Sequence, residues 1–168
     1  VYRRVNPQYK EHYDLLMSSG LYDDLVSSGL LIPHEEVQLA DESANGAYKV
    51  LKPEMIPFIS YPYEWCFSQL KDAALTTLEI QKRALSRDMT IKDCSAYNIQ
   101  FHKGRPLLID TLSFEKYVEG YPWVAYKQFC QHFLAPLVLM SIKDIRFNQL
   151  FRVHIDGVPL DLARSLLP

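Results

Sequence analysis

The sequence predicts a single α+β domain that is mostly helical and carries short antiparallel hairpins. A long amphipathic segment at about 63–87 has apolar side chains at helical spacing. Two β-type runs, 98–101 and 106–109, flank the turn-like stretch 102–105. A further apolar stripe from Trp123 to Leu137 again has helical spacing. These patterns together indicate short strands within a largely helical domain.

The first third of the chain predicts two helices and a few extended pieces. Asn6 and Pro7 are typical of a helix start, and the following helix should end at Gly20. A shorter helix at 21–27 should stop before Gly29. The runs 37–39 and 48–51 flank Asn45, which precedes a glycine, and this pattern predicts a hairpin. The run 56–59 is expected to add a third extended piece.

The last third of the chain predicts helices. We expect Pro136 to kink the helix of the Trp123 to Leu137 stripe. A further helix is expected at 142–151, and Pro159 should open a last short one.

Length and composition favour one globular unit. The chain has 168 residues, of which 48% are apolar and 23% charged, so residues 1–168 can form a single domain with its own core. A net charge of −2 with scattered Lys and Arg argues against a nucleic acid partner. Three widely spaced cysteines, no signal segment and no bilayer-length apolar run favour a cytoplasmic protein with no membrane partner.

Asp93 is followed five positions later by Asn98, and a predicted hairpin then delivers Asp110. The hairpin should bring the two acids toward the same end, because an antiparallel pair places its entry beside its exit. Over roughly 63–115 this pattern resembles protein-kinase-like and aminoglycoside-phosphotransferase-like enzymes. The resemblance implies the C-terminal lobe of a kinase-like fold. It also implies Mg-ATP as cofactor, with Asp93 acting on an acceptor hydroxyl and Asn98 and Asp110 as magnesium ligands.

Two further residues are candidates by position alone. Lys52, or its neighbour Lys49, stands in a possible strand where a phosphate-binding lysine is expected. Glu64 lies at the start of the long helix and is a candidate to face the site, although the aromatic residues around it favour core packing.

The sequence also departs from the kinase pattern. Its six glycines are widely separated, so no glycine-rich phosphate loop is visible, and Asp110 is followed by Thr111 and Leu112 instead of Phe-Gly. Lys92 stands where protein kinases usually carry Arg. These differences favour a pseudokinase-like remnant over a working kinase.

Simpler interpretations exist for several of these residues. Asp93, Asn98 and Asp110 have the types that start loops and end hairpins, through local backbone hydrogen bonds. Cys94 is expected to be a small buried residue. The run 34–36, His-Glu-Glu, lacks the second His of a zinc motif and is interpreted as a solvated turn.

A second resemblance covers nearly the whole chain. It rests on the runs 19–25, 31–36, 60–65, 92–101 and 109–115, which look like the N-terminal region of nodulation-protein NoeA-related, S-adenosylmethionine-dependent methyltransferases. The resemblance implies a longer parent whose downstream methyltransferase domain is the partner of this segment and binds S-adenosylmethionine. Because the chain has no glycine-rich strand-turn-helix, methyl transfer is assigned to the parent, and 1–168 is expected to be an excised N-terminal piece.

Three functions are compatible with these patterns. The leading hypothesis is a kinase-like accessory domain of a methyltransferase that binds a small-molecule substrate or nucleotide, or positions a partner, without phosphorylating anything itself. An active small-molecule phosphotransferase using Mg-ATP is the second. The third is a purely structural module that docks the downstream domain.

Overall fold

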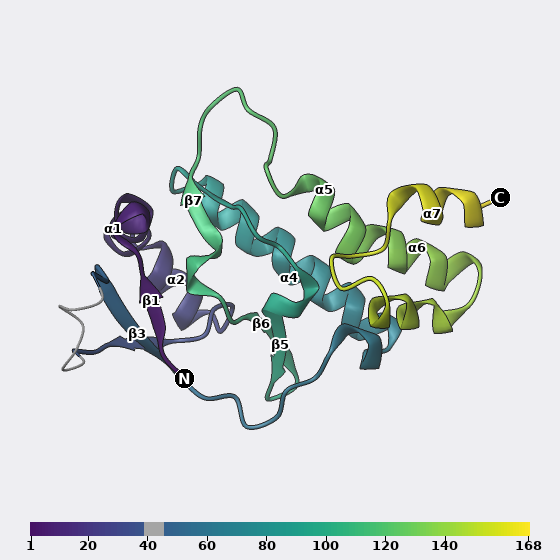
Figure 1. Ribbon diagram of the computed structural model, residues 1–168, viewed down its shortest axis with the longest axis horizontal. Coiled ribbons are helices and arrows are strands. Elements are labelled where there is room, and N and C mark those ends of the chain that lie inside the picture. The colour runs from purple at the N-terminus through teal and green to yellow at the C-terminus, as the bar shows by residue number, and fades with distance from the viewer. Residues whose placement is uncertain (39–45) are drawn as a thin grey trace.

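The computed structural model describes residues 1–38 and 46–168. A small sheet and two helices form the N-terminal part, while the rest of the chain combines two short strand ladders with a larger set of helices (Figure 1). All strand pairs between named strands are antiparallel in the described residues. The predicted α+β class with small antiparallel sheets is therefore confirmed.

The N-terminal sheet has the strand order β1-β3-β2, with β3 in the centre. Its strands are β1 (Arg3–Val5), β2 (His34–Glu36) and β3 (Lys49–Pro53). An antiparallel pair is present as β2 and β3, but β2 lies entirely before the predicted run 37–39, whose described residues 37 and 38 are not in a strand. The predicted turn residue Asn45 lies outside the described residues. The run His-Glu-Glu is thus a strand, and its interpretation as a solvated turn was wrong.

The run 56–59 is not a strand. Pro57 removes a backbone donor in its middle, and Phe58 and Ile59 are exposed, so the run has neither a ladder nor a buried face. The prediction of a third extended piece, which rested on the apolar composition of this run, was therefore wrong as a strand. Instead, this stretch carries the chain from β3 to the long helix (Figure 1).

The two predicted N-terminal helices are present as α1 (Lys10–Ser18) and α2 (Leu21–Ser27). The start at Asn6 and Pro7 is a 3-10 turn, η1 (Pro7–Tyr9), which leads directly into α1. Gly20 joins the two helices at φ +73°, a left-handed conformation that glycine adopts without steric cost. Leu16, Leu21 and Leu25 are fully buried and join the main core.

The long helix predicted at about 63–87 is present as α4 (Phe67–Leu85), and several of its side chains belong to the main core. It follows the 3-10 turn η2 (Pro62–Glu64), and Trp65 between the two is 1% exposed. The buried face of α4 consists of residues at helical spacing, namely Leu70, Ala73, Ala74, Thr77, Ile80, Gln81 and Ala84.

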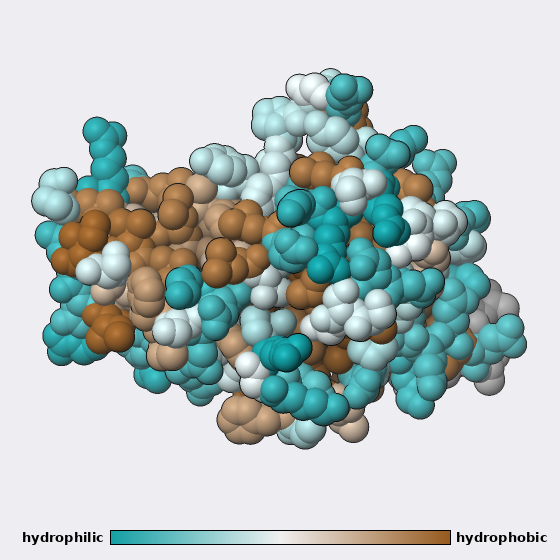
Figure 2. Space-filling view, turned by 180° about the vertical axis from the view of Figure 1, so that it is seen from behind, coloured by the Kyte–Doolittle hydropathy of each residue, from teal (hydrophilic) through white to brown (hydrophobic). Residues whose placement is uncertain are grey.

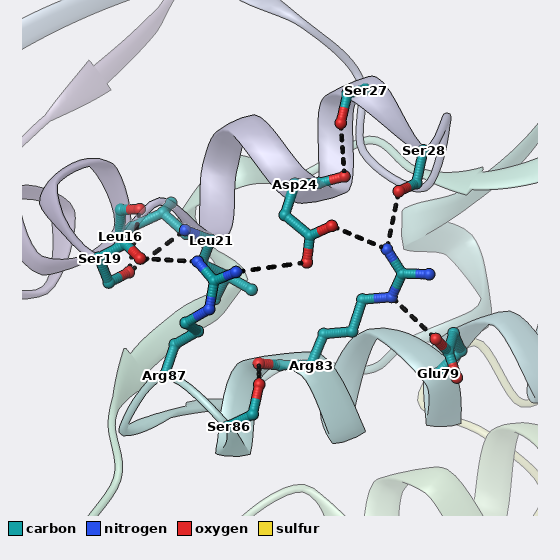
Figure 3. Close-up of polar contacts among 10 residues, drawn as sticks. All are labelled: Leu16, Ser19, Leu21, Asp24, Ser27, Ser28, Glu79, Arg83, Ser86 and Arg87. Atoms are coloured by element: carbon teal, nitrogen blue, oxygen red, sulfur yellow. Dashed lines mark hydrogen bonds and ion pairs between the residues drawn. The ribbon is translucent and has the colours of Figure 1, made fainter.

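Polar contacts tie α2 to the end of α4 (Figure 3). The Arg83 guanidinium donates to Glu79 at 2.8 Å, to Asp24 at 3.0 Å and to the Ser28 hydroxyl at 2.7 Å. Arg87 donates to the Ser19 carbonyl at 2.7 Å, across the turn between α1 and α2. The helical pair is therefore attached to α4 by charged groups as well as by its leucines.

Two short ladders follow α4. The predicted hairpin is present as β5 (Ile99–His102) and β6 (Arg105–Leu108), paired with Ile99 opposite Leu108. A second pair, β4 (Met89–Ile91) and β7 (Phe114–Lys116), was not predicted. Each of its strands has three residues, which is too short for a recognisable period-2 pattern. The two strands are also far apart in sequence, so no turn signal links them.

The C-terminal helical part differs from the prediction in detail. It consists of α5 (Tyr126–Phe129), a π-helix η5 (Cys130–Leu134), α6 (Ala135–Ile142), a 3-10 helix η6 (Ile145–Arg152) and α7 (Leu160–Leu166). The π-helix directly precedes Pro136, whose missing N–H and bulky ring disturb a normal α-turn. The helix expected at 142–151 is instead the end of α6 followed by η6, whereas the last helix after Pro159 is confirmed.

Within the described ranges, none of the helices combines the length and apolar character needed to cross a lipid bilayer.

Candidate functional site

Strands β4 and β7 bring the two predicted acids to one end of their ladder. Ile91 at the end of β4 pairs with Phe114 at the start of β7, and the Lys92 N–H donates to the Ser113 carbonyl at 2.8 Å. Asp93 leaves β4 two residues later, and Asp110 enters the turn before β7. Because the strands are antiparallel, both acids lie beyond the same end of the ladder.

Asn98 is brought to this region by the hairpin. The pairing of β5 with β6 continues one step further, where the Ile109 N–H donates to the Asn98 carbonyl at 2.8 Å. Asn98 therefore lies across the hairpin from the residue before Asp110. The three segments that carry Asp93, Asn98 and Asp110 thus meet, through the unpredicted β4–β7 pair as much as through the hairpin.

One oxygen of Asp93 is held by hydrogen bonds and the other is not. Asp93 Oδ1 accepts from the Ser95 N–H at 3.1 Å and from Gln128 Nε2 at 2.8 Å. Its Oδ2 has no hydrogen-bond partner among the described residues. The contact to Ser95 is the local turn bond expected of a loop Asp. The contact to Gln128 comes from a distant helix and leaves Oδ2 available to a ligand.

The Asn98 side chain carries an unsatisfied polar group. Its Nδ2 is buried and has no hydrogen-bond partner in the part of the chain that the structure describes. Buried polar groups in native proteins nearly always have a partner, and an unmade hydrogen bond costs about 1–3 kcal/mol. This amide therefore favours a site that a ligand or ordered water completes.

Asp110 is engaged from two sides. Its Oδ1 caps the following turn by accepting from the Leu112 N–H at 3.1 Å, and it accepts from the Arg3 guanidinium at 3.4 Å. Arg3 and the turn thus engage the same oxygen of this carboxylate. Across the described ranges, no three His, Cys, Asp or Glu side chains are arranged to hold a metal. A magnesium ion at Asn98 and Asp110 would therefore depend on phosphate oxygens of a ligand for its remaining coordination.

A cleft of about 610 Å³ adjoins this region. Its wall includes Ile109, the residue before Asp110, together with the apolar side chains Ile32, Ile56 and Ile59. Arg3 also lines it. Asp93, Asn98 and Asp110 are not among the residues that line the cleft, which reaches their region through Ile109 and through Arg3, the partner of Asp110. Its volume falls in the range typical of small-molecule sites.

Lys52 lies on β3 and lines the same cleft. It is the cross-strand partner of Glu35, and its Nζ lies 3.8 Å from the Glu35 carboxylate. The two side chains are more than half exposed, so this ion pair is weak and leaves the lysine free to turn to an anion.

Glu64 has a different environment. Its carboxylate accepts from the Tyr61 N–H at 2.8 Å and closes the η2 turn. Among the described residues Glu64 does not belong to the cleft wall. The structure therefore places it in the cap of a 3-10 turn, outside the cleft wall.

His34 is a residue of the cleft that sequence reasoning missed. Its backbone N–H donates to the Tyr22 hydroxyl at 2.8 Å, and its Nε2 lies 3.1 Å from the Tyr13 hydroxyl. Burial lowers the pKa of His34, and the nearby Glu36 carboxylate opposes that shift. Its strand position beside two tyrosines gives no recognisable pattern, because the tyrosines come from α1 and α2.

Cys94 is a buried structural residue, as expected. The side chain is 2% exposed, and burial raises the pKa of its thiol to about 12. A thiol that stays protonated at neutral pH is a poor nucleophile.

A second cavity, of about 670 Å³, lies under the loop between β7 and α5. Tyr117, Tyr121 and Trp123 line it, and the Trp123 indole donates to the Ile91 carbonyl at 2.7 Å. Its wall contains none of the residues of the Asp93, Asn98 and Asp110 group.

The fold and the site define an α+β domain in which a polar loop and hairpin border a cleft. No family model matches the sequence. Over 137 residues the chain is 39% identical to the nodulation protein NoeA of Rhizobium meliloti (strain 1021). This similarity covers 80% of the chain but 29% of NoeA, so the chain spans less than a third of that relative. The predicted relationship to NoeA is confirmed, whereas methyltransferase activity stays a prediction.

Proposed function

We propose that the chain is a kinase-like accessory domain that binds a nucleotide or a similar phosphorylated small molecule in the cleft beside the Asp93 loop. The observation that carries this proposal is the order of elements around the site. A strand leads into the loop with Asp93 and Asn98, a hairpin follows, and Asp110 precedes a strand that pairs with the first. The succession of loop, hairpin and second acid is the one that the kinase-like resemblance implies, and the pairing of β4 with β7 adds to it.

The chemistry of the cleft supports such a ligand. Ile32, Ile56, Ile59 and Ile109 provide apolar walls for a planar ring, while Arg3 and Lys52 supply cations for phosphate groups. The buried Asn98 amide, unpartnered within the described residues, would gain a hydrogen-bond partner on binding.

Binding is favoured over phosphoryl transfer. The sequence has no glycine-rich loop to hold the phosphates in line, and Asp110 is followed by Thr111 and Leu112 instead of Phe-Gly. The sequence also lacks a glycine-rich strand-turn-helix that could hold S-adenosylmethionine. We therefore assign methyl transfer, which the NoeA-related resemblance implies, to other parts of a longer protein.

Thermal unfolding with ATP, with and without Mg²⁺, tests this proposal. We expect a Mg²⁺-dependent rise in Tm, because a ligand that binds only the folded state stabilises it. Asp110→Asn should remove the rise, whereas the exposed Asp161→Asn on α7 should keep it. No rise in the wild-type protein would contradict the proposal.

An active phosphotransferase is the alternative outcome at the same site. The free Oδ2 of Asp93 favours it, since a general base needs an oxygen that no other group occupies. Mg²⁺-dependent ATP turnover that Asp93→Ala and Asp110→Ala abolish would replace the binding-only proposal.

A docking module is the second candidate function. Leu134, Val138 and Ile142 are spaced by four residues along η5 and α6, and Leu134 and Ile142 are at least half exposed. Figure 2 shows a hydrophobic area at the left of the rear view, over the helices at the right of Figure 1. Because the chain spans 29% of NoeA, the proposed occupant is another part of a longer protein.

Charged substitutions test the docking function. Leu134→Glu together with Ile142→Glu should leave the Tm of the 168-residue chain nearly unchanged but lower that of a longer protein. Val153→Glu, at an exposed site outside this stripe, serves as the control. An equal effect on both lengths would exclude docking through this face.

A further inference from the structure

The loop that carries the site is held from one side by two polar side chains. Gln128 Oε1 accepts from the Cys94 N–H at 2.7 Å, while its Nε2 donates to Asp93 Oδ1 at 2.8 Å. His132 Nδ1 accepts from the Ala96 N–H at 3.3 Å. One residue of the loop therefore has its carboxylate fixed, and two have their backbone amides fixed.

Gln128 and His132 are one helical turn apart and face the loop together. Gln128 lies on α5 and His132 on the π-helix η5, a type of helix that occurs frequently at functional sites. His132 is 1% exposed, and burial lowers its pKa to about 4, against the opposing charges of Asp93 and Asp156. The ring is therefore neutral at pH 7 and its Nδ1 can accept a hydrogen bond.

The C-terminal segment in turn holds this helix and the loop. The Val158 N–H donates to the Gln131 carbonyl within the π-helix at 2.9 Å. The Tyr97 hydroxyl donates to the Phe151 carbonyl at 2.9 Å, so the loop is also fixed from the side of η6. Loop and helix are thus joined to the same C-terminal segment, which supports the contact between Gln128 and Asp93.

We propose that Gln128 is a positioning residue of the ligand site: it holds Asp93 by Oδ1, so that Oδ2 is presented to the bound molecule, and His132 supports it by fixing the next turn of the loop. This inference rests on the proposed ligand-binding function. A purely structural staple would need only the contact to the Cys94 N–H. The additional contact to the Asp93 carboxylate selects which carboxylate oxygen stays free, and it is this contact that assigns a positioning role.

Gln128→Glu separates the two contacts of this side chain. The substitution keeps the size of the side chain and the acceptor for the Cys94 N–H. It also places a second negative charge beside Asp93, and the repulsion should turn the Asp93 carboxylate toward the phosphates of bound ATP. We expect amide hydrogen exchange at Cys94 to stay within about twofold of wild type, while the affinity for Mg-ATP falls at least about tenfold. Gln128→Met, which loses both contacts, should raise the exchange rate at Cys94 and also weaken Mg-ATP.

Lys127→Glu is the matched control. It adds negative charge one residue away on an exposed side chain that does not contact the loop, so it should change neither measurement by more than about twofold. If Gln128→Glu binds Mg-ATP like wild type, or if Lys127→Glu weakens binding equally, the positioning role is overturned. If wild type itself does not bind Mg-ATP, the proposed function fails. If amide hydrogen exchange at Cys94 is unchanged in Gln128→Met, the claim that Gln128 protects the Cys94 N–H is overturned.

Discussion

His132 acts in this fold as a hydrogen-bond acceptor that must remain neutral. Its Nδ1 accepts from the Ala96 N–H inside the protein, and its ring lies 6.1 Å from that of Phe151. Burial lowers the pKa of His132 to about 4. A proton on Nδ1 would remove the acceptor and place a charge among apolar side chains, so the folded state disfavours protonation.

This residue makes stability depend on pH. Below about pH 6.5 the unfolded chain binds a proton at position 132 that the folded protein does not bind until about pH 4, so the free energy of unfolding falls between these values. The loss from this group is at most about 3 kcal/mol.

Chemical denaturation at pH 7 and pH 4.5 measures the effect. His132→Asn should lose less stability than wild type over this interval, whereas His154→Asn, at a partly exposed site, should behave like wild type. Equal pH dependence in all three proteins would contradict the assignment.

For single residues, the sequence suggests the candidates that lie close together along the chain, but not the distant side chains that contact them. Asp93, Asn98 and Asp110 could be proposed as candidates because they stand within 18 residues of one another in the sequence. Arg3 lies 107 residues from Asp110, and Gln128 lies 35 residues from Asp93. Such contacts depend on tertiary packing, which no local pattern encodes.

Helix α4 and strand β4 are linked by a buried side chain. Gln81 is 6% exposed, and its Oε1 accepts from the Ile91 N–H at 2.8 Å. Its Nε2 donates to the Thr90 hydroxyl at 2.9 Å. The only named strand that pairs with β4 within the described residues is β7, so Gln81 satisfies a backbone group on its other edge.

Removing this link should destabilise the protein. Gln81→Leu preserves volume but leaves the Ile91 N–H buried without an acceptor, and it should lower the free energy of unfolding by about 1–3 kcal/mol. Lys82→Leu, next to it on the exposed face of α4, should change stability by no more than about 0.5 kcal/mol. Urea unfolding measures both, and an equal loss in the two variants would show that Gln81 is not a structural link.

Elements with strong periodicity were predicted and those without it were not. The long helix and the β5–β6 hairpin have clear apolar patterns and turn residues, whereas β4 and β7 have only three residues each. The π-helix could not be predicted, because its extra residue depends on the contact with the segment after η6 and on Pro136.

Across the whole molecule, the C-terminal segment closes onto the π-helix at Gly157. This glycine has φ +93°, and a Cβ there would lie 2.7 Å from the Gln131 Cβ and 2.9 Å from the His132 ring. Neither the backbone conformation nor the space permits a side chain.

Gly157→Ala should therefore be strongly destabilising. We expect a loss of about 2–4 kcal/mol, from backbone strain and from the displaced π-helix together. Gly120→Ala has a similar φ of +85° with nothing near the added carbon, so it should lose only the strain, about 1–2 kcal/mol. Thermal unfolding compares the two, and similar losses would show that the close contact at Gly157 does not matter.

The hydrogen bond from Tyr97 to Phe151 bears on how the chain can be divided. A fragment that ended after α6 would keep every strand described above, yet it would lose the acceptor of the Tyr97 hydroxyl and the Val158 donor to the Gln131 carbonyl. A fragment that keeps both of these supports of the Asp93 loop therefore includes Val158. Expression boundaries chosen from strand topology alone would cut through the support of the very loop they were meant to isolate.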